Sequence, residues 1–203
     1  MSDARPTVFV VDDDNSVRES LGLLIESAGW RPETFGSGPE FLARPRAAGP
    51  SCLVLDVVLP DLDGCELQAL VADRADMPII FITGHTDVPL AVRAMKAGAV
   101  DFFTKPWNDD IFVATIRHAI NRSCAALGNA QVMRDLRDSY ASLSRREREV
   151  MALVVAGRLN KQVGGELGIS EITVKAHRGS MMRKMKARSL PDLVNMAARL
   201  REA

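Results

Sequence analysis

The chain has 203 residues, of which 47% are hydrophobic and 26% are charged, enough to bury a core in one or two domains. No apolar stretch approaches the roughly 20 residues of a membrane-spanning helix, which argues against a helical membrane protein. The 26 basic and 26 acidic residues cancel, but residues 1–122 carry a net charge of −7 and residues 140–203 carry +7. An acidic front and a basic tail indicate two domains, with a polyanion as the partner of the tail.

Short apolar, β-branched segments alternate with helical segments through the first 122 residues. Strands are expected at residues 7–12, 31–35, 52–57, 78–83 and 100–106. Helices are expected at residues 16–29, 38–45, 64–73, 88–98 and 109–122. Five strands that alternate with helices predict an α/β fold, a doubly wound (βα)5 parallel sheet with helices on both faces.

The pattern changes after residue 122. The segment 123–140 is mixed and contains Gly128, and we interpret it as the end of an extended helix followed by a helical linker. Four short helices and no strand are expected after it, at about residues 144–156, 160–167, 171–186 and 190–200. A turn containing Gly168 separates the second and third of these, which is typical of a helix-turn-helix in an all-α domain.

The three cysteines, Cys52, Cys65 and Cys124, are scattered along the chain and show no CxxC or metal-ligand spacing. Such a set favours a reduced protein whose thiols are small packing side chains. We therefore expect a cytoplasmic protein with no membrane partner.

Polar side chains stand where the predicted strands end. The first strand runs into the three aspartates at 12–14, and later strands end on Asp56, Thr83 and Lys105. Because ligands of an open parallel sheet lie beyond the carboxyl ends of its strands, these side chains should converge at one edge. Clustered carboxylates raise one another's pKa unless a cation relieves the repulsion, and Mg²⁺ prefers such oxygen ligands.

This set of side chains suits phosphoryl transfer. Asp56 stands alone on its strand and can serve as a metal ligand and as a nucleophile, because carboxylates form aspartyl phosphates. Lys105 would neutralise one phosphoryl oxygen, and Thr83 would donate a hydrogen bond to another. Taken singly, an acid at a strand end is more often a turn or helix cap, and Asp14 suits the cap of the next helix.

The segments VVDDD, VLDVVLPDLDG, FITGH and DFFTKP resemble the receiver domain of two-component response regulators over the first 122 residues. The resemblance implies that Asp56 is the phosphoacceptor and that a histidine kinase donates the phosphoryl group. It implies that Asp12 and Asp13 form the acidic pair, with Asp13 as the direct Mg²⁺ ligand. The backbone carbonyl of Val58 would complete the protein ligands of the metal.

The same resemblance assigns roles on the last two strands. Thr83 and Lys105 would contact the phosphoryl group, and the Lys105–Pro106 peptide bond is expected to be cis. Phe102 matches the aromatic residue that switches with Thr83, although an ordinary core position is the alternative interpretation.

The third helix of the tail should present a basic face. Ser170 is a good N-cap for it. An inward stripe recurs at steps of three and four residues, namely Val174, His177, Met181 and Met185. The basic residues fall largely off this stripe: Lys175, Arg178, Arg183, Lys184 and Lys186. A basic amphipathic helix without a nucleic-acid role is the alternative.

The tail resembles a LuxR-type (NarL/FixJ) DNA-binding domain over residues 142–200, through LSRREREVMALVVAGRLNKQV, LGISEITVKAHRGSMMRKM and RSLPDLV. The resemblance implies that the helix after Ser170 enters the major groove, with Lys175 and Ala176 facing bases. Candidates for phosphate contacts are Lys161, Thr173, Arg178, Arg183 and Lys184. Gly179 stands where the family often has a base-contacting side chain. The two glycines of VGGEL also depart from the family, and they either soften that helix or permit close approach of the next.

These observations predict a response regulator, a transcription factor and not an enzyme, with a receiver at 1–122, a linker at 123–140 and a LuxR-type domain at 141–203. Phosphorylation would pair the 88–98/100–105 face with a second copy, and the homodimer would bind promoter DNA, with activation and a contact to RNA polymerase expected. The segment 109–140 either transmits the change or holds the tail masked, and both remain open. The alternatives are a Mg²⁺-dependent phosphatase with Asp12 as nucleophile and a DNA-binding protein that does not depend on phosphorylation.

Overall fold

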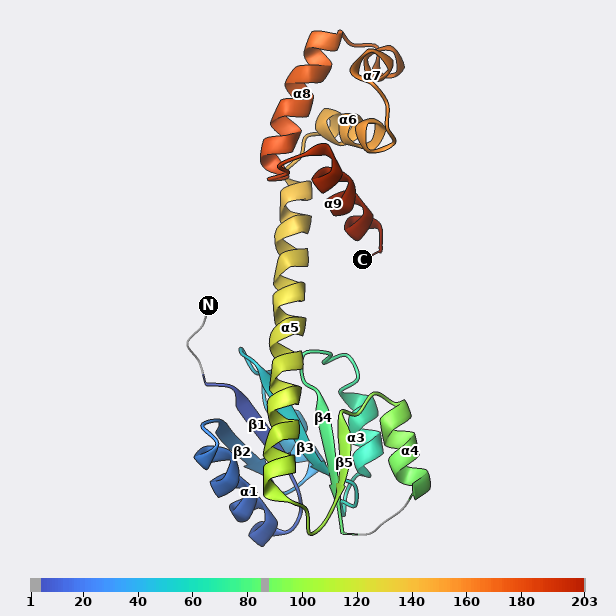
Figure 1. Ribbon diagram of the computed structural model, residues 1–203. Helices are drawn as coiled ribbons and strands as arrows, with labels where there is room; N and C mark the ends of the chain where they lie inside the picture. The colour runs from blue at the N-terminus through green and yellow to red at the C-terminus, as the bar shows by residue number, and fades with distance from the viewer. Residues whose placement is uncertain (1–4, 85–87, 203) are drawn as a thin grey trace. The chain divides into compact units, whose positions relative to one another are not determined.

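The structure is a computed structural model that describes residues 5–84 and 88–202. The chain forms two compact units, Met1–Gly128 and Asn129–Ala203, which we call unit 1 and unit 2. Figure 1 shows their helices and strands. His85, the last residue of the motif FITGH, lies outside the described residues. Among the helices of the described ranges, none is both long and apolar enough to cross a membrane.

Unit 1 is built on a five-stranded parallel sheet with the strand order β2-β1-β3-β4-β5. The strands are β1 (Thr7–Val11), β2 (Arg31–Phe35), β3 (Ser51–Asp56), β4 (Ile79–Thr83) and β5 (Asp101–Thr104). The helices between them are α1 (Asn15–Ser27), α2 (Gly38–Ala43), α3 (Gly64–Leu70) and α4 (Val88–Lys96), and α5 (Asp109–Ala141) follows. The predicted doubly wound sheet is therefore confirmed.

Alternate residues of the central strands enter two hydrophobic cores on opposite faces of the sheet. Phe9, Leu55 and Phe81 pack toward α2, α3 and α4. Val10 and Val54, which lie next to these residues in sequence, pack toward α1 and α5. Figure 1 shows α1 and α5 on one side of the sheet and α3 and α4 on the other. Because both faces are covered, the middle residues of the inner strands are apolar on both faces, as in other parallel sheets.

The strand order places the acidic residues together. Strand β1 lies between β2 and β3, so the strand order reverses at this point of the sheet. Val11 pairs with Leu55 in the register of β1 and β3. The next residues, Asp12 just after β1 and Asp56 at the end of β3, therefore lie side by side at the carboxyl edge of the sheet.

Helix α5 is longer than the helix predicted at 109–122, because it continues without interruption to Ala141. Gly128 lies inside it, where an added Cβ would meet no heavy atom within 4 Å. One glycine costs a helix only up to about 1 kcal/mol relative to alanine, and strong helix formers surround this one. The segment 123–140 is thus helical, while the predicted domain limits stay a prediction.

Unit 2 contains the end of α5 and the helices α6 (Arg145–Val155), α7 (Asn160–Leu167), α8 (Glu171–Lys184) and α9 (Leu190–Glu202). The predicted four helices are confirmed. Ser144 caps α6, Gly168 ends α7 with φ 67°, and Ser170 caps α8 by accepting a hydrogen bond from the Thr173 N–H. Val174, Met181 and Met185 of the predicted inward stripe are buried in the core of unit 2, while His177 is half-buried.

The two glycines of α7 have different surroundings. A Cβ on Gly164 would lie 2.8 Å from the carbonyl oxygen of Ile169, at the turn into α8. A Cβ on Gly165 would meet nothing within 4 Å. Gly164 therefore permits the close approach of the next helix, and Gly165 only weakens α7.

Candidate functional site

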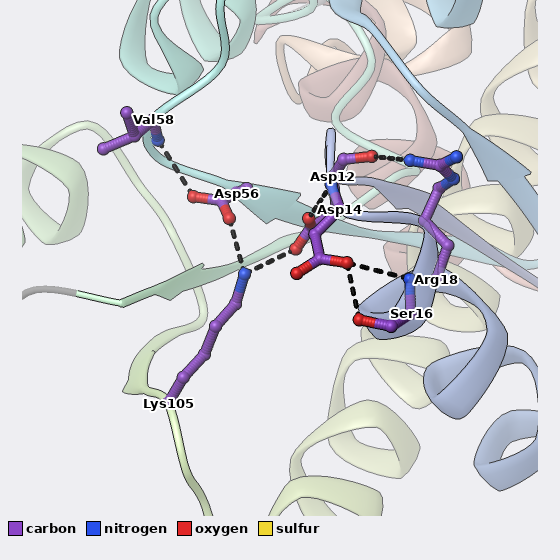
Figure 2. A network of polar contacts seen from close by, with 7 residues as sticks. All are labelled: Asp12, Asp14, Ser16, Arg18, Asp56, Val58 and Lys105. Carbon is purple, nitrogen blue, oxygen red and sulfur yellow. Dashed lines mark hydrogen bonds and ion pairs between the residues drawn. The ribbon is translucent and has the colours of Figure 1, made fainter.

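A lysine lies between two buried carboxylates at the carboxyl edge of the sheet (Figure 2). Lys105 Nζ is 2.7 Å from Asp12 Oδ2 and 2.7 Å from Asp56 Oδ2. Asp12 is 0% exposed and Asp56 is 5% exposed. The ends of β1, β3 and β5 supply these side chains, so segments far apart in sequence meet as the strand ends predict.

One lysine does not balance the acidic groups of this edge. Asp13 joins Asp12 and Asp56, and carboxylate oxygens of the three residues lie within 4.8 Å of one another. Burial raises the pKa of Asp12, and repulsion from Asp56 adds to this, although hydrogen bonds from Lys105 and the Asp14 N–H oppose it. Burial lowers the pKa of Lys105, but its hydrogen bonds to Asp12 and Asp56 outweigh burial and raise it. The site therefore favours a further positive charge.

The donor set fits Mg²⁺, which prefers oxygen ligands and is often held by one or two carboxylates and several waters. Asp12, Asp13 and Asp56 would hold the ion, and Asp13 is exposed, which leaves one side of the site open to water. The N–H of Val58 donates to Asp56 Oδ1 at 2.9 Å, so this residue adjoins the site. The role of its carbonyl as a metal ligand stays a prediction.

The third aspartate of the run has a different role. Asp14 Oδ1 accepts hydrogen bonds from the Ser16 N–H at 2.8 Å and the Ser16 hydroxyl at 2.6 Å, which caps α1. These bonds lower the pKa of Asp14. Arg18 of α1 donates to the Asp12 carbonyl at 2.6 Å and so fixes the turn between strand and helix (Figure 2). The helix-cap interpretation of Asp14 is confirmed.

A glycine sets how closely the loop after β3 approaches the strand. A Cβ on Gly64, the first residue of α3, would lie 2.5 Å from the carbonyl oxygen of Asp56. Asp63 and Glu66 form a capping box that starts α3 at this position. Only glycine fits here, so the motif VLPDLDG contains a steric requirement as well as acidic residues.

The predicted switch residues occupy β4 and β5. Thr83 ends β4 and is 1% exposed, and its carbonyl accepts a hydrogen bond from the Lys105 N–H at 2.7 Å. Phe102 packs on the α4 side of the sheet, with its ring centroid 6.4 Å from that of Phe81. Phe103 points to the other face. The Lys105–Pro106 peptide bond is cis, as the resemblance implies. The switching role of Thr83 and Phe102 stays a prediction.

The predicted DNA-contacting residues of unit 2 differ in exposure and in their partners. Lys161, Lys175, Ala176, Arg183 and Lys184 are exposed, whereas Thr173 and Arg178 are half-buried. Lys175 Nζ lies 3.3 Å from the Glu171 carboxylate, and three of the other residues also have partners in unit 2. The Thr173 hydroxyl bonds to that of Ser170 at 2.8 Å, and Arg178 Nη1 donates to Asn160 Oδ1 at 3.0 Å. Lys184 Nζ lies 2.6 Å from Glu147 Oε2.

The contact between Lys184 and Glu147 is missed by sequence reasoning. Glu147 is 4% exposed. Its hydrogen bonds with Lys184, Ser180 and the Ser144 N–H lower its pKa to about 2. The spacing of Ser144 and Glu147 is that of a capping box, but only the packing of α6 on α8 shows the lysine. Lys184 therefore stabilises unit 2 through this ion pair. Its proposed contact with a DNA phosphate would use the exposed part of the same side chain.

The chain matches two known families. Residues 8–117 match the response regulator receiver domain, and residues 141–197 match the bacterial regulatory proteins of the luxR family. The response regulator protein TodT of Pseudomonas putida is 44% identical over 204 residues, which cover 100% of this chain and 90% of TodT. The transcriptional regulatory protein FixJ of Bradyrhizobium diazoefficiens is 43% identical, over 95% of this chain and 94% of FixJ.

Solved structures agree with this assignment. The response regulator StyR has a TM-score of 0.87 and 43% identity, and the match covers 97% of this chain and 100% of StyR. Both units carry the features of their families, an acidic strand edge with a lysine in unit 1 and a helix-turn-helix in unit 2. The chain belongs to the two-component response regulators that join a receiver domain to a LuxR-type DNA-binding domain, and it is a transcription factor.

Proposed function

We propose that Asp56 accepts a phosphoryl group from the phosphohistidine of a sensor histidine kinase, and that this step controls DNA binding by unit 2. The P–N bond of the donor breaks, a P–O bond forms to the Asp56 carboxylate, and the leaving imidazole takes up a proton. The observation that supports this most directly is the position of Lys105, 2.7 Å from both Asp12 and Asp56.

The side chains of the edge have separable roles in this transfer. Lys105 offsets negative charge on the phosphoryl group, and Thr83 donates a hydrogen bond to it. Bound Mg²⁺, held by Asp12, Asp13 and Asp56, would supply further charge compensation for the phosphoryl oxygens. Little other chemistry is needed, because phosphoryl transfer depends mainly on placement and electrostatic stabilisation.

We propose that the phosphorylated protein dimerises through the α4–β5 face. Val88, Val92 and Met95 recur at helical spacing on α4 and are 65%, 47% and 43% exposed. Phe102 packs in the core beneath the same helix. A shift of Thr83 and Phe102 toward the phosphoryl group would thus repack the layer under this apolar surface, which would then bind its copy in a second chain.

Dimerisation would align two α8 helices on half-sites about one DNA turn apart. The exposed basic residues of unit 2 then contact phosphates, which supply affinity, and Lys175 and Ala176 face base edges, which supply specificity. We propose that the result is activation of transcription through RNA polymerase, in the cytoplasm.

The phosphoacceptor is tested by replacing Asp56. Incubated with Mg²⁺ and acetyl phosphate or a partner kinase, the wild-type chain should gain one phosphoryl group in intact mass spectra, and Asp56→Asn should gain none. Asp14→Asn is the matched control, since it removes an aspartate of the same edge that only caps α1, and it should be labelled normally. Labelling that persists in Asp56→Asn, or that maps to Asp12, would instead support the phosphatase alternative.

The variant Lys175→Ala tests whether α8 contacts base edges in the major groove of DNA. A base-contacting lysine should contribute about 1–3 kcal/mol to binding of preferred DNA and its loss should relax sequence preference. Arg199→Ala removes the same charge from the exposed surface of α9, so it controls for net charge. Equal losses in the two variants, measured by fluorescence anisotropy, would show that Lys175 contributes charge alone.

A further inference from the structure

The outward face of α8 is apolar at its start. Ile172, Ala176, Gly179 and Arg183 follow one another at steps of four, three and four residues, so they share one face, which we call the outer row. Each lies two positions, about 200° around the helix, from one of the buried residues Val174 and Met181. The outer row is therefore the part of α8 that faces away from the core of unit 2.

Ile172 is 80% exposed, the highest value among the large hydrophobic side chains of the described residues. Other groups favour the first turn of α8, since Ser170 caps it and Glu171 is an acidic residue at its start. Single exposed hydrophobic residues are common and need no explanation by themselves. Ile172 differs because it stands at the N-terminal end of the outer row, and the N-terminal residues of a recognition helix contact base edges.

The neighbours of Ile172 leave the start of this row without a hydrogen-bonding side chain. Lys175 lies to one side, with its Nζ 3.3 Å from the carboxylate of Glu171. Gly179 has no side chain, and Arg183 Nη1 lies 3.8 Å from the position that a Cβ of Gly179 would take. The hydrogen-bonding capacity of the row is thus at its C-terminal end, and its N-terminal end offers only the Ile172 and Ala176 hydrocarbon groups.

We propose that Ile172, with the Ala176 methyl group beside it, reads the C5-methyl group of thymine in the major groove. Thymine presents this methyl group there, cytosine does not, and apolar side chains select it by contact. The inference rests on the proposed entry of α8 into the groove. It adds a specificity residue that prefers thymine over cytosine and treats 5-methylcytosine as thymine at the same position.

The test removes single methyl groups from DNA. Preferred duplexes are first selected from a random pool with the full chain, treated with acetyl phosphate and Mg²⁺. Each thymine is then replaced by uracil, which lacks only the methyl group, and binding is measured by fluorescence anisotropy. One or two thymines per half-site should lose about fourfold in affinity on replacement, the change that about 0.8 kcal/mol per buried methyl-sized group gives. At those positions 5-methylcytosine should bind more tightly than cytosine.

Ile172→Ser should bind thymine and uracil duplexes equally at the sensitive positions. Leu159→Ser is the matched control, because Leu159 is a 70% exposed aliphatic residue at the start of α7, outside the outer row. It should keep the fourfold preference.

Selected DNA that binds equally with thymine or uracil everywhere would overturn the methyl-reading inference and leave DNA binding intact. A preference that survives in Ile172→Ser would overturn the assignment to this residue. If no sequence is enriched from the pool, the proposed function fails and this inference fails with it.

Discussion

Each unit buries a carboxylate beside a lysine, but the two pairs differ in what surrounds them. In unit 1, Lys105 contacts Asp12 and Asp56 while Asp13 lies close by, and burial raises the pKa of Asp12. In unit 2, Glu147 accepts hydrogen bonds from Lys184 and two further donors, and its pKa falls to about 2. Since both carboxylates are buried, the imbalance of charge, more than burial, distinguishes the site in unit 1 from the structural ion pair in unit 2.

The chain allows the two units to be followed separately. Both of its tryptophans, Trp30 and Trp107, belong to unit 1, and its only tyrosine, Tyr140, belongs to unit 2. Tryptophan fluorescence therefore reports unfolding of unit 1, while far-UV circular dichroism reports the helices of both.

Replacing Glu147 should cause the largest loss of stability, because it removes the carboxylate of the Glu147–Lys184 pair in unit 2. Glu147→Ala removes a helix cap worth about 1 kcal/mol and a charge-assisted hydrogen bond worth about 1.5–3 kcal/mol, so unit 2 should lose about 2.5–4 kcal/mol. Urea unfolding followed by circular dichroism measures the loss, and tryptophan fluorescence should not change. Glu149→Ala is the control, because Glu149 forms ion pairs with Arg145 and Arg146 near the surface that are worth at most about 1 kcal/mol. Similar losses of stability in Glu147→Ala and Glu149→Ala would contradict the distinction between the buried ion pair and the surface ion pairs.

The same pair predicts a pH dependence. The pKa of Glu147 is about 2 in the folded chain, below its ordinary value of 4.5, so ionised Glu147 stabilises unit 2 above pH 4.5. This stabilisation is lost as the pH falls toward 2. The stability difference between the wild type and Glu147→Ala should shrink over that range, and a difference that stays constant would be inconsistent with the lowered pKa.

The next prediction concerns Mg²⁺, which should bind the carboxylates of unit 1 that Lys105 alone does not balance. A ligand that binds only the folded state stabilises it by about 2.7 kcal/mol at 100 times its Kd, so saturating Mg²⁺ should raise the unfolding midpoint of unit 1 and leave unit 2 unchanged. Tryptophan fluorescence during thermal unfolding measures this shift. A shift that persists in Asp13→Asn would place the ion elsewhere.

A smaller effect is expected from Asp12→Asn without Mg²⁺. The folded state raises the pKa of Asp12 above its ordinary 3.8. The charged carboxylate of Asp12 therefore opposes folding at neutral pH, and only the protonated carboxyl group favours folding. The neutral isostere should therefore raise the stability of unit 1 at neutral pH, which a higher Tm in thermal unfolding would show. Destabilisation at neutral pH would show that the hydrogen bond from Lys105 outweighs the cost of burial.

The smallest effect compares two adjacent glycines. Gly165→Ala should stabilise unit 2 by up to about 1 kcal/mol, because alanine favours the helix and open space surrounds the position. Gly164→Ala should destabilise it, since the new Cβ would meet the Ile169 carbonyl at 2.8 Å, as alanine at Gly64 would meet that of Asp56 in unit 1. Urea unfolding followed by circular dichroism measures both changes in stability. Equal changes in the two variants would contradict the steric difference between the two positions.

Local patterns in the sequence determined the architecture and most of the acidic edge. Alternation of strands and helices requires a parallel sheet, and a parallel sheet brings its carboxyl ends to one edge, so Asp56, Thr83 and Lys105 could be placed together. Caps such as Asp14 and Ser170 depend on bonds to residues two or three positions away, which the sequence shows directly. In unit 2 the same local rules placed the helices.

The partners that these residues meet across the fold follow from how the helices and strands pack. The contact of Lys184 with Glu147 spans 37 residues and depends on how α6 packs on α8. The different surroundings of Gly164 and Gly165 likewise follow from steric space that neighbouring residues in the sequence do not reveal. Periodicity and capping are properties of adjacent residues, whereas ion pairs and close approaches depend on distances between elements, which exist only once the chain has packed.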